Sequence, residues 1–367
     1  MDLLQSGFKR GYFFPFSFLF ILSGTGHAQT KFISYNHPSL YYEGRVSKNK
    51  DAAELSWSGT SVTIFFKGTN LSAILKDAGT ANYYNVIVDN KDIFKIHTDT
   101  IKKTYVLASG LVNKKHRIQL FKRTEWTMGK TWLYGFETSK ATKIFQTTPP
   151  SKRKIEFYGN SITCGYAIED SSGNDSWHGN FQNNYLTYAA ITARYYKAQY
   201  SCIARSGIGI MVSWDHLIMP EMYSRLDATD STSKWDFKKY IPDVVVVNLF
   251  QNDSYLTQAT DLEQFEYRFG KTGPDEKFII ESYKNFIKEL RNKYNNAHII
   301  CVLGSMDATK EGSPWPGYIQ KAVEQLHDSK IYTHFFEFKK TVGHPGIAEQ
   351  KVMANSLIEF IEKNIKW

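Results

Sequence analysis

Four residues that could take part in a reaction stand in the second part of the chain. Three directly follow apolar, strand-like runs, and one precedes a helical run. Ser161 follows "KIEFYGN", Gly207 follows "QYSCIARS", Asn252 follows "DVVVVNLFQ", and His344 precedes the last helical run. A histidine can take the proton of a serine hydroxyl as it attacks a carbonyl carbon. Glycine N–H and asparagine amide groups can donate hydrogen bonds to the oxygen that becomes negative. The set therefore predicts serine-dependent acyl chemistry.

The first of these positions lies in the stretch "IEFYGNSITCGYAIED", residues 155–170. Its apolar start is typical of a strand, and Gly159-Asn160 favours a sharp turn after it. Ser161 is then expected at the carboxyl end of a strand, where open α/β sheets bind their ligands. The Gly-x-Ser-x-Gly signature is absent, because Thr163 occupies its last position.

Strand-like and helix-like runs alternate over residues 155–367, which predicts a three-layer α/β domain with a parallel sheet. Two runs, 244–249 and 299–303, are apolar without alternation, as expected of strands covered on both faces. The expected strands are 154–159, 199–207, 243–253, 297–305 and 331–338, and the expected helices are 183–198, 275–294, 317–329 and 348–366.

Residues 29–146 show a different texture, with short β-rich runs such as "SVTIFFKG" and "HRIQLFKRT" between turn residues. This pattern predicts an all-β antiparallel sandwich of the jelly-roll kind. Residues 147–154 are expected to form an extended linker, because Pro149 and Pro150 restrict the backbone.

The N-terminal segment 1–28 places Lys9 and Arg10 before a short apolar run that ends in small residues near Ala28. This layout is typical of a cleavable signal peptide, so we expect an exported protein, periplasmic or extracellular. An anchoring helix is the alternative, but the run is short and interrupted by Pro15. No membrane span is expected after signal cleavage.

Composition narrows the partners and cofactors. The net charge is +9, but the lysines are scattered and no nucleic-acid motif accompanies them, so nucleic acid is not expected as a partner. No metal or other cofactor is expected, because His178, His216 and His334 lack ligand spacing. The sequence leaves the oligomeric state open. The cysteines are expected to be buried free thiols, since they are odd in number and stand in apolar contexts: Cys164, Cys202 and Cys301.

The four blocks "GNSITCGY", "ARSGIGI", "NLFQND" and "VGHPG" resemble, in order, those of the SGNH (GDSL-like) hydrolase superfamily. With a β-rich region and "LFKRTE" ahead of them, the chain is most similar to carbohydrate esterase family two. That resemblance implies a serine ester hydrolase that removes acetyl groups from plant polysaccharides such as xylan or mannan. It implies that Ser161 and His344 are catalytic. It also implies that Ser161, Gly207 and Asn252 form the oxyanion hole.

Three departures from the superfamily pattern bear on activity. Asn160 replaces the usual aspartate of the first block, and Phe250 replaces the usual glycine of the third, where a bulky ring could narrow the acyl pocket or shift Asn252. Thr341 and Val342 stand where an aspartate usually orients the histidine. A Ser-His dyad held by a backbone carbonyl, as the family implies for some members, is therefore expected, with Glu337 a distant alternative.

Four aromatic residues near the blocks are candidates for stacking on sugar rings: Trp315, Trp214, Tyr255 and Trp177. Trp315, between two prolines in "GSPWPGY", is the preferred contact because its surroundings favour a loop. Core packing is the alternative for each of them.

The resulting prediction is an esterase acting on acetylated polysaccharide or oligosaccharide. Two alternatives remain open. Phe250 and the absent aspartate favour a catalytically weakened carbohydrate-binding protein. A short-chain lipid esterase or thioesterase of the same superfamily is the other.

Overall fold

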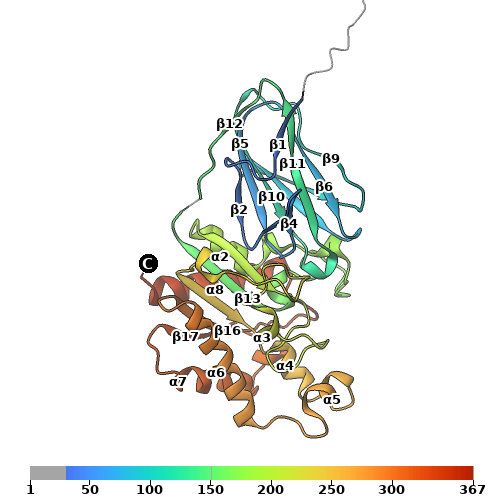
Figure 1. Ribbon diagram of the computed structural model, residues 1–367. Coiled ribbons are helices and arrows are strands. Elements are labelled where there is room, and N and C mark those ends of the chain that lie inside the picture. The colour runs from blue at the N-terminus through green and yellow to red at the C-terminus, as the bar shows by residue number, and fades with distance from the viewer. Residues whose placement is uncertain (1–29, 150, 367) are drawn as a thin grey trace, which may run out of the picture.

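The computed structural model describes residues 30–149 and 151–366. Figure 1 shows a β-sandwich, residues 30–149, stacked on an α/β unit, residues 151–366. The expected signal peptide, 1–28, lies outside the described residues. No described helix is long and apolar enough to cross a membrane. The boundaries of the two expected domains and the linker stay a prediction.

The β-sandwich consists of two antiparallel six-stranded sheets. One follows the order β3-β4-β11-β6-β9, with β1 also paired to β11; the other follows β12-β5-β10-β7-β8, with β2 paired to β5. An all-β sandwich is thus confirmed, and the jelly-roll topology stays a prediction. The strands are β1 (Thr30–Ser34), β2 (Tyr41–Glu43), β3 (Ser47–Lys48), β4 (Ala53–Leu55), β5 (Ser61–Gly68), β6 (Leu71–Asp77), β7 (Tyr83–Val88), β8 (Asp92–His97), β9 (Lys103–Ala108), β10 (Lys114–Lys122), β11 (Thr131–Ser139) and β12 (Lys143–Phe145).

The α/β unit is built on a parallel sheet of five strands in the order β14-β13-β15-β16-β17. The predicted parallel sheet is confirmed, and the first strand begins and ends at the predicted residues. The strands are β13 (Lys154–Gly159), β14 (Gln199–Ala204), β15 (Val244–Asn248), β16 (His298–Leu303) and β17 (Ile331–Phe335).

Helices cover both faces of this sheet (Figure 1). Val244 and Val246 point toward α2 and α8, whereas Val245 and Val247 point toward α6 and α7. Burial on both faces explains why the strand runs are apolar without alternation. The helices are α1 (Ser161–Cys164), α2 (Tyr188–Tyr195), α3 (Met219–Met222), α4 (Gln251–Leu256), α5 (Glu263–Phe269), α6 (Glu276–Lys293), α7 (Trp315–Glu324) and α8 (Ile347–Asn364).

Several details differ from the expectation. Helix α2 is shorter than predicted, because Asn184–Leu186 forms a separate short 3-10 helix before Thr187 caps α2. The short helix α5 and the exposed strand β8 were not predicted. The three cysteines are free and buried, as predicted.

The sandwich packs on the β14 side of the parallel sheet. Phe121 of β10 stacks on Tyr200 of β14, with ring centroids 6.4 Å apart. A buried ion pair also joins the two parts, because Arg45 Nη2 lies 3.2 Å from Glu156 Oε1 and both side chains are fully buried. The other guanidinium nitrogen donates to the carbonyl oxygens of Tyr223 and Arg225.

Replacing Arg45 with leucine should destabilise the protein strongly, because it removes the positive partner of the buried Glu156 carboxylate and the donor to two carbonyl oxygens. Breaking a buried ion pair from one side typically costs about 3–5 kcal/mol. Thermal and urea unfolding should therefore show a large fall in stability. The matched surface change Lys103→Ala breaks an exposed pair with Asp99 and should leave the unfolding midpoint unchanged. Equal effects of the two changes would contradict this assignment.

Candidate active site

The carboxyl ends of three neighbouring strands bring the predicted residues together. Strand β13 lies between β14 and β15, and the chain leaves β13 to one side to form β14 and then crosses to the other side to form β15. The loops after these strands therefore meet at the topological switch point of the sheet. Ser161 follows β13, Gly207 follows β14 and Asn252 follows β15. His344 enters from the loop between β17 and α8. All four line one cleft of about 300 Å³.

Ser161 begins the four-residue helix α1 immediately after β13. Asn160 caps this helix, because its side-chain oxygen accepts a hydrogen bond from Ile162 N at 3.1 Å. Only glycine fits at position 159, since a Cβ there would lie 2.1 Å from Thr163 Oγ1. The turn therefore lifts the serine out of the sheet, and the departure at Asn160 supports the turn without reaching His344.

His344 lies between two oxygen atoms. Its Nε2 is 2.8 Å from Ser161 Oγ, and its Nδ1 is 2.6 Å from Asp175 Oδ2. A carboxylate accepts hydrogen bonds, so Nδ1 carries the proton and Nε2 of the neutral ring accepts from the serine hydroxyl. The expectation that a backbone carbonyl holds the imidazole is wrong, because a carboxylate does so. The geometry is that of a Ser-His-Asp triad.

Asp175 is held firmly against the histidine loop. Its Oδ1 accepts the backbone N–H of His344 at 2.8 Å. Gly343 permits this approach, since a Cβ there would lie 2.9 Å from the same oxygen. Burial by itself would raise the pKa of Asp175, but the hydrogen bonds from His344 and the charges of His344 and Lys339 outweigh it and lower the pKa. The carboxylate is therefore ionised throughout the pH range in which a neutral imidazole can act as a base.

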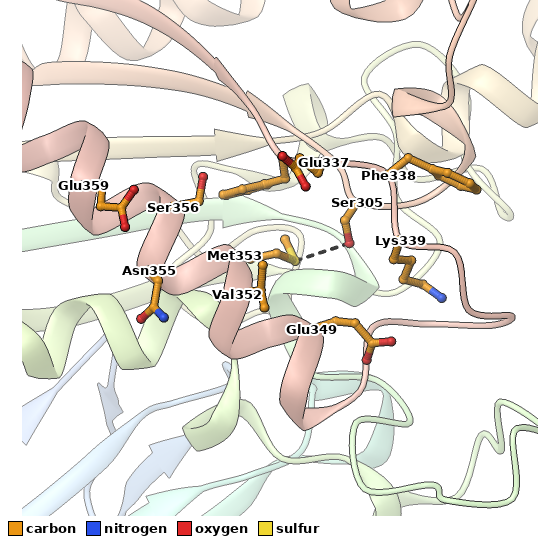
Figure 2. Close-up of a pocket in the computed structure, with 11 residues that line it drawn as sticks. Ser305, Glu337, Phe338, Lys339, Glu349, Val352, Met353, Asn355, Ser356 and Glu359 are labelled. Carbon is orange, nitrogen blue, oxygen red and sulfur yellow. Dashed lines mark hydrogen bonds between the residues drawn. The ribbon is translucent and has the colours of Figure 1, made fainter.

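Glu337, the distant alternative, does not contact His344. It lines a separate cavity of about 410 Å³ between α8 and the segment after β17, as Figure 2 shows. Glu349 of the same cavity supports the histidine loop from behind, because it accepts from Thr341 Oγ1 at 2.7 Å and from Gly346 N at 2.8 Å. The cavity contains neither Ser161 nor His344.

Gly207 and Asn252 face the same cleft from the other side. Gly207 has a φ of 78°, a left-handed conformation that favours glycine, and a Cβ there would lie 3.1 Å from Trp214 Cβ. Asn252 Nδ2 donates to Ile208 O at 2.8 Å, which fixes the amide relative to the loop after β14. Both residues line the cleft that contains Ser161.

Phe250 lies outside the cleft, so the expectation that it narrows the acyl pocket is wrong. Its side chain is fully buried and packs on Tyr283 and Trp315, with centroid distances of 4.7 and 5.0 Å. Its φ of 85° explains why glycine is usual at this position. The fold accepts a left-handed phenylalanine here because the ring fills the core beneath α4.

Two of the predicted aromatic residues line the cleft. Trp177 is 51% exposed and Trp214 is 48% exposed, so both rings keep a free face. Tyr255, on α4, stacks on Trp214 with ring centroids 5.5 Å apart and borders a neighbouring cavity. Tyr166, which sequence reasoning missed, also lines the cleft and packs on the ring of His344 at 4.5 Å.

Trp315 requires a correction. It begins helix α7 and is only 5% exposed, so it does not lie in a loop. Proline on both sides marks the start of a helix here, because proline is well tolerated in a first turn. The ring belongs to the core and borders the neighbouring cavity but not the cleft with Ser161.

Comparison with known proteins places the chain in a family. Residues 42–150 match the family model of the carbohydrate esterase 2 N-terminal domain. A solved structure of a family two carbohydrate esterase from Clostridium thermocellum, in complex with cellohexaose, is 32% identical, with a TM-score of 0.79 over 88% of this chain and 98% of that one. The chain belongs to carbohydrate esterase family two. This membership confirms the resemblance drawn from the four blocks and the expected class of carboxylic ester hydrolase.

Two curated proteins extend the likeness. The cellulase/esterase CelE of Acetivibrio thermocellus is 33% identical over 90% of this chain, which spans 40% of the length of that protein. An acetylxylan esterase / glucomannan deacetylase of Cellvibrio japonicus is 24% identical, and the match covers 93% of both chains. The similarity thus extends over both the sandwich and the α/β unit.

Asp175 is a second site residue that sequence reasoning missed. It stands in the loop "EDSSGNDSWHGN" between α1 and α2, far in sequence from His344. The loop carries three acidic residues, Glu169, Asp170 and Asp175, and no spacing distinguishes among them. In the structure Asp170 shapes the loop instead, because it accepts from Ser172 N and Ser176 N at 2.9 and 2.8 Å. Only the folded chain identifies the acid that meets His344.

The left-handed conformation of Phe250 predicts that a glycine variant is more stable than an alanine variant at this position. Phe250→Ala should destabilise by about 3–5 kcal/mol, because it leaves a cavity in the core. Phe250→Gly removes more atoms but relieves about 1–2 kcal/mol of left-handed strain, so it should be the more stable of the two. Denaturant unfolding of both variants measures the order. A glycine variant less stable than the alanine variant would show that the backbone is not strained here.

Proposed function

We propose that this protein is an exported carbohydrate O-acetyl esterase that releases acetate from acetylated polysaccharide or oligosaccharide. The observation that carries the proposal is the hydrogen-bonded line from Ser161 through His344 to Asp175 at the edge of an open cleft. Membership in carbohydrate esterase family two supports the substrate class.

Ser161 is the proposed nucleophile. A serine hydroxyl is a weak nucleophile at neutral pH, so His344 Nε2 takes its proton as Oγ attacks the acetyl carbon. The imidazolium that forms faces the Asp175 carboxylate, which keeps the ring in the correct tautomer and stabilises the positive charge. His344 then donates the proton to the departing sugar oxygen, and water repeats the sequence to release acetate.

The negative oxygen of each tetrahedral intermediate needs donors already aimed at it. The backbone N–H groups of Ser161 and Gly207 and the side-chain amide of Asn252 are the proposed donors. One amide hydrogen of Asn252 is donated to Ile208 O, which fixes the amide group, and the second is the proposed donor to the oxyanion. Removal of one such donor typically lowers the rate by about 10²–10³. The proposed mechanism uses no cofactor.

The cleft suits a sugar that carries a small acyl group. Trp177 and Trp214 offer flat apolar faces for pyranose rings, and Arg205 and Asp215 add a polar ion pair to the lining. The curated relatives are named acetylxylan esterase / glucomannan deacetylase and cellulase/esterase. An acetylated β-linked plant polysaccharide is the proposed substrate, with Tyr255 supporting Trp214 from behind.

The proposed location is the periplasm or the outside of the cell, and it rests on the signal-peptide pattern of residues 1–28. A large insoluble polysaccharide is accessible only there. We also propose that residues 29–146 form a jelly-roll domain and that 147–154 link it to the hydrolase domain, 155–367.

The two alternatives, a sugar-binding protein and a lipid esterase or thioesterase, are less well supported than the acetyl esterase. A weakened, sugar-binding protein was favoured by Phe250 and by a missing aspartate, yet Phe250 lies in the core and Asp175 contacts His344. A lipid esterase or thioesterase needs an apolar acyl channel. The cleft has a volume of about 300 Å³ and is lined mainly by polar and aromatic side chains, which favours a short acyl group.

Ser161→Ala should abolish turnover of 4-nitrophenyl acetate and of acetylated xylan, because no other hydroxyl lies in reach of His344 Nε2 among the described hydrogen bonds. We expect kcat to fall to less than about one thousandth of the parent value, with the fold intact. Acetate release and 4-nitrophenolate absorbance measure the effect. Equal rates for parent and variant would refute the esterase proposal.

The assignment of the orienting acid has a matched pair of variants. Asp175→Asn keeps the shape but removes the acceptor that selects the tautomer, so kcat should fall by about 10³–10⁴ with little change in KM. Glu337→Gln alters the acid on the other cavity and should leave kcat unchanged. Steady-state kinetics at several pH values and thermal unfolding should accompany both. Loss of kcat in Glu337→Gln with full activity in Asp175→Asn would reverse the assignment.

A further inference from the structure

The end of β10 carries three charged residues into the contact between sandwich and α/β unit. Lys122, Arg123 and Glu125 are all buried. Lys122 Nζ braces this segment from inside, because it donates to Asn82 Oδ1 at 2.8 Å and to Thr124 O at 2.9 Å. The segment "LFKRTE" is therefore rigidly placed, and the mechanism above assigns it no task.

Arg123 ties the segment to the loop before α2. Its Nε donates to Gln182 O at 3.1 Å, and its guanidinium forms an ion pair with Glu169. Gln182 in turn accepts the backbone N–H of Glu125 through its Oε1 at 3.0 Å. Position 125 is thus fixed relative to the α/β unit and not only to the sandwich.

The Glu125 carboxylate contacts two of the four sequence blocks. Oε2 accepts the backbone N–H of Ser206 at 2.8 Å, and Oε1 accepts from the hydroxyl of the same residue. Cys164, at the end of the helix that Ser161 begins, lies against Oε2 with its Sγ 4.0 Å away. The carboxylate therefore lies between the helix of the serine and the glycine loop.

Ser206 immediately precedes Gly207, whose N–H is a proposed oxyanion donor. The far side of this loop has its own support, since the buried carboxylate of Asp253 accepts the N–H groups of Ile210 and Met211 at 3.0 and 2.7 Å. Asp253 belongs to the α/β unit, next to Asn252. The near side of the loop depends on Glu125, which belongs to the sandwich.

The cost of burying this carboxylate argues for a specific task. Burial raises the pKa of Glu125, and the hydrogen bonds from Ser206 and the charge of Arg205 oppose that rise. A buried charge is tolerated only when such partners satisfy it. Here its main partners are the N–H group and the hydroxyl of Ser206. The buried carboxylate is therefore stabilised only while Ser206 stays in this position.

We infer that Glu125 is a positioning residue that holds the Ser206-Gly207 segment in the geometry needed to stabilise the oxyanion. The β-sandwich then supplies a residue that positions the glycine loop of the α/β unit, whether or not it also binds glycan. This inference rests on the proposed esterase function.

The test compares Glu125→Gln with the parent enzyme on 4-nitrophenyl acetate. The amide keeps the size of the side chain but loses the negative charge and one of the two acceptor oxygens. It therefore cannot accept from both the N–H and the hydroxyl of Ser206, as the carboxylate does. A displacement of a catalytic group by about 1 Å lowers the rate by up to about 10²-fold. We therefore expect kcat to fall about 10- to 100-fold, with KM little changed.

A second readout separates positioning from general damage. Methylboronic acid forms a tetrahedral adduct with the serine and places an oxygen in the oxyanion site. Its inhibition constant should rise by about the same factor as kcat/KM falls, whereas a deacetylated xylo-oligosaccharide should bind with unchanged affinity. Ser206→Ala, which removes the hydroxyl donor, should give a smaller loss in the same direction and serves if Glu125→Gln fails to fold.

Glu43→Gln is the matched control. Glu43 is also a sandwich carboxylate near β14, where it accepts from Gln119 Nε2 at 3.3 Å, and it does not contact the glycine loop. It should leave kcat and boronate affinity unchanged. An active parent whose Glu125→Gln and Ser206→Ala variants retain full kcat and boronate affinity would overturn the inference. A parent no faster than Ser161→Ala would instead refute the esterase proposal itself.

Discussion

Parallel pairing of β13 with both β14 and β15 is the constraint on which the site depends. Three strands that run in the same direction end at one edge, so the loops that follow them must share a small space. The turn at Gly159 then decides that a hydroxyl rather than a backbone group enters this space. The histidine reaches it from the loop before α8, and Gln350 ties α8 to the serine helix by donating to Ile162 O at 2.9 Å.

Carboxylates hold the loops that the sheet brings together. Asp175 fixes the histidine loop through two hydrogen bonds, Asp253 fixes the far side of the glycine loop, and Glu125 holds its near side. Each accepts backbone N–H groups that irregular loops leave unpaired. Backbone N–H groups bonded to a rigid acceptor keep their direction, and a site that stabilises transient charge requires donors with fixed directions.

The sandwich and the α/β unit share more than a packed surface. The buried pair of Arg45 and Glu156 and the segment around Lys122 place charged groups from the sandwich deep in the contact. Buried charges require exact partners, so such a contact tolerates few relative orientations. This rigidity is what allows a residue of one part to position a loop of the other.

Local patterns in the sequence predict the class of fold, the order of strands and helices along the α/β unit, and the four positions in the loops after the strands. Apolar runs without alternation, a Gly-Asn turn before a serine, and a histidine before a final helix are local patterns, and local patterns survive in a linear chain. The sequence also indicated Trp177 and Trp214, which follow from their places near those blocks. Family resemblance then linked these patterns to ester chemistry.

The folded chain is needed to identify the acid that contacts His344, the packing of Phe250 in the core and the contacts of Glu125. Asp175 is separated from the histidine by almost the whole α/β unit, and three acids of its loop look alike in sequence. The residues next to Phe250 and Trp315 in the sequence predict that both line the cleft, yet the two side chains pack against each other in the core. These contacts join residues distant in sequence, and their choice depends on the packing of the whole chain rather than on any local preference.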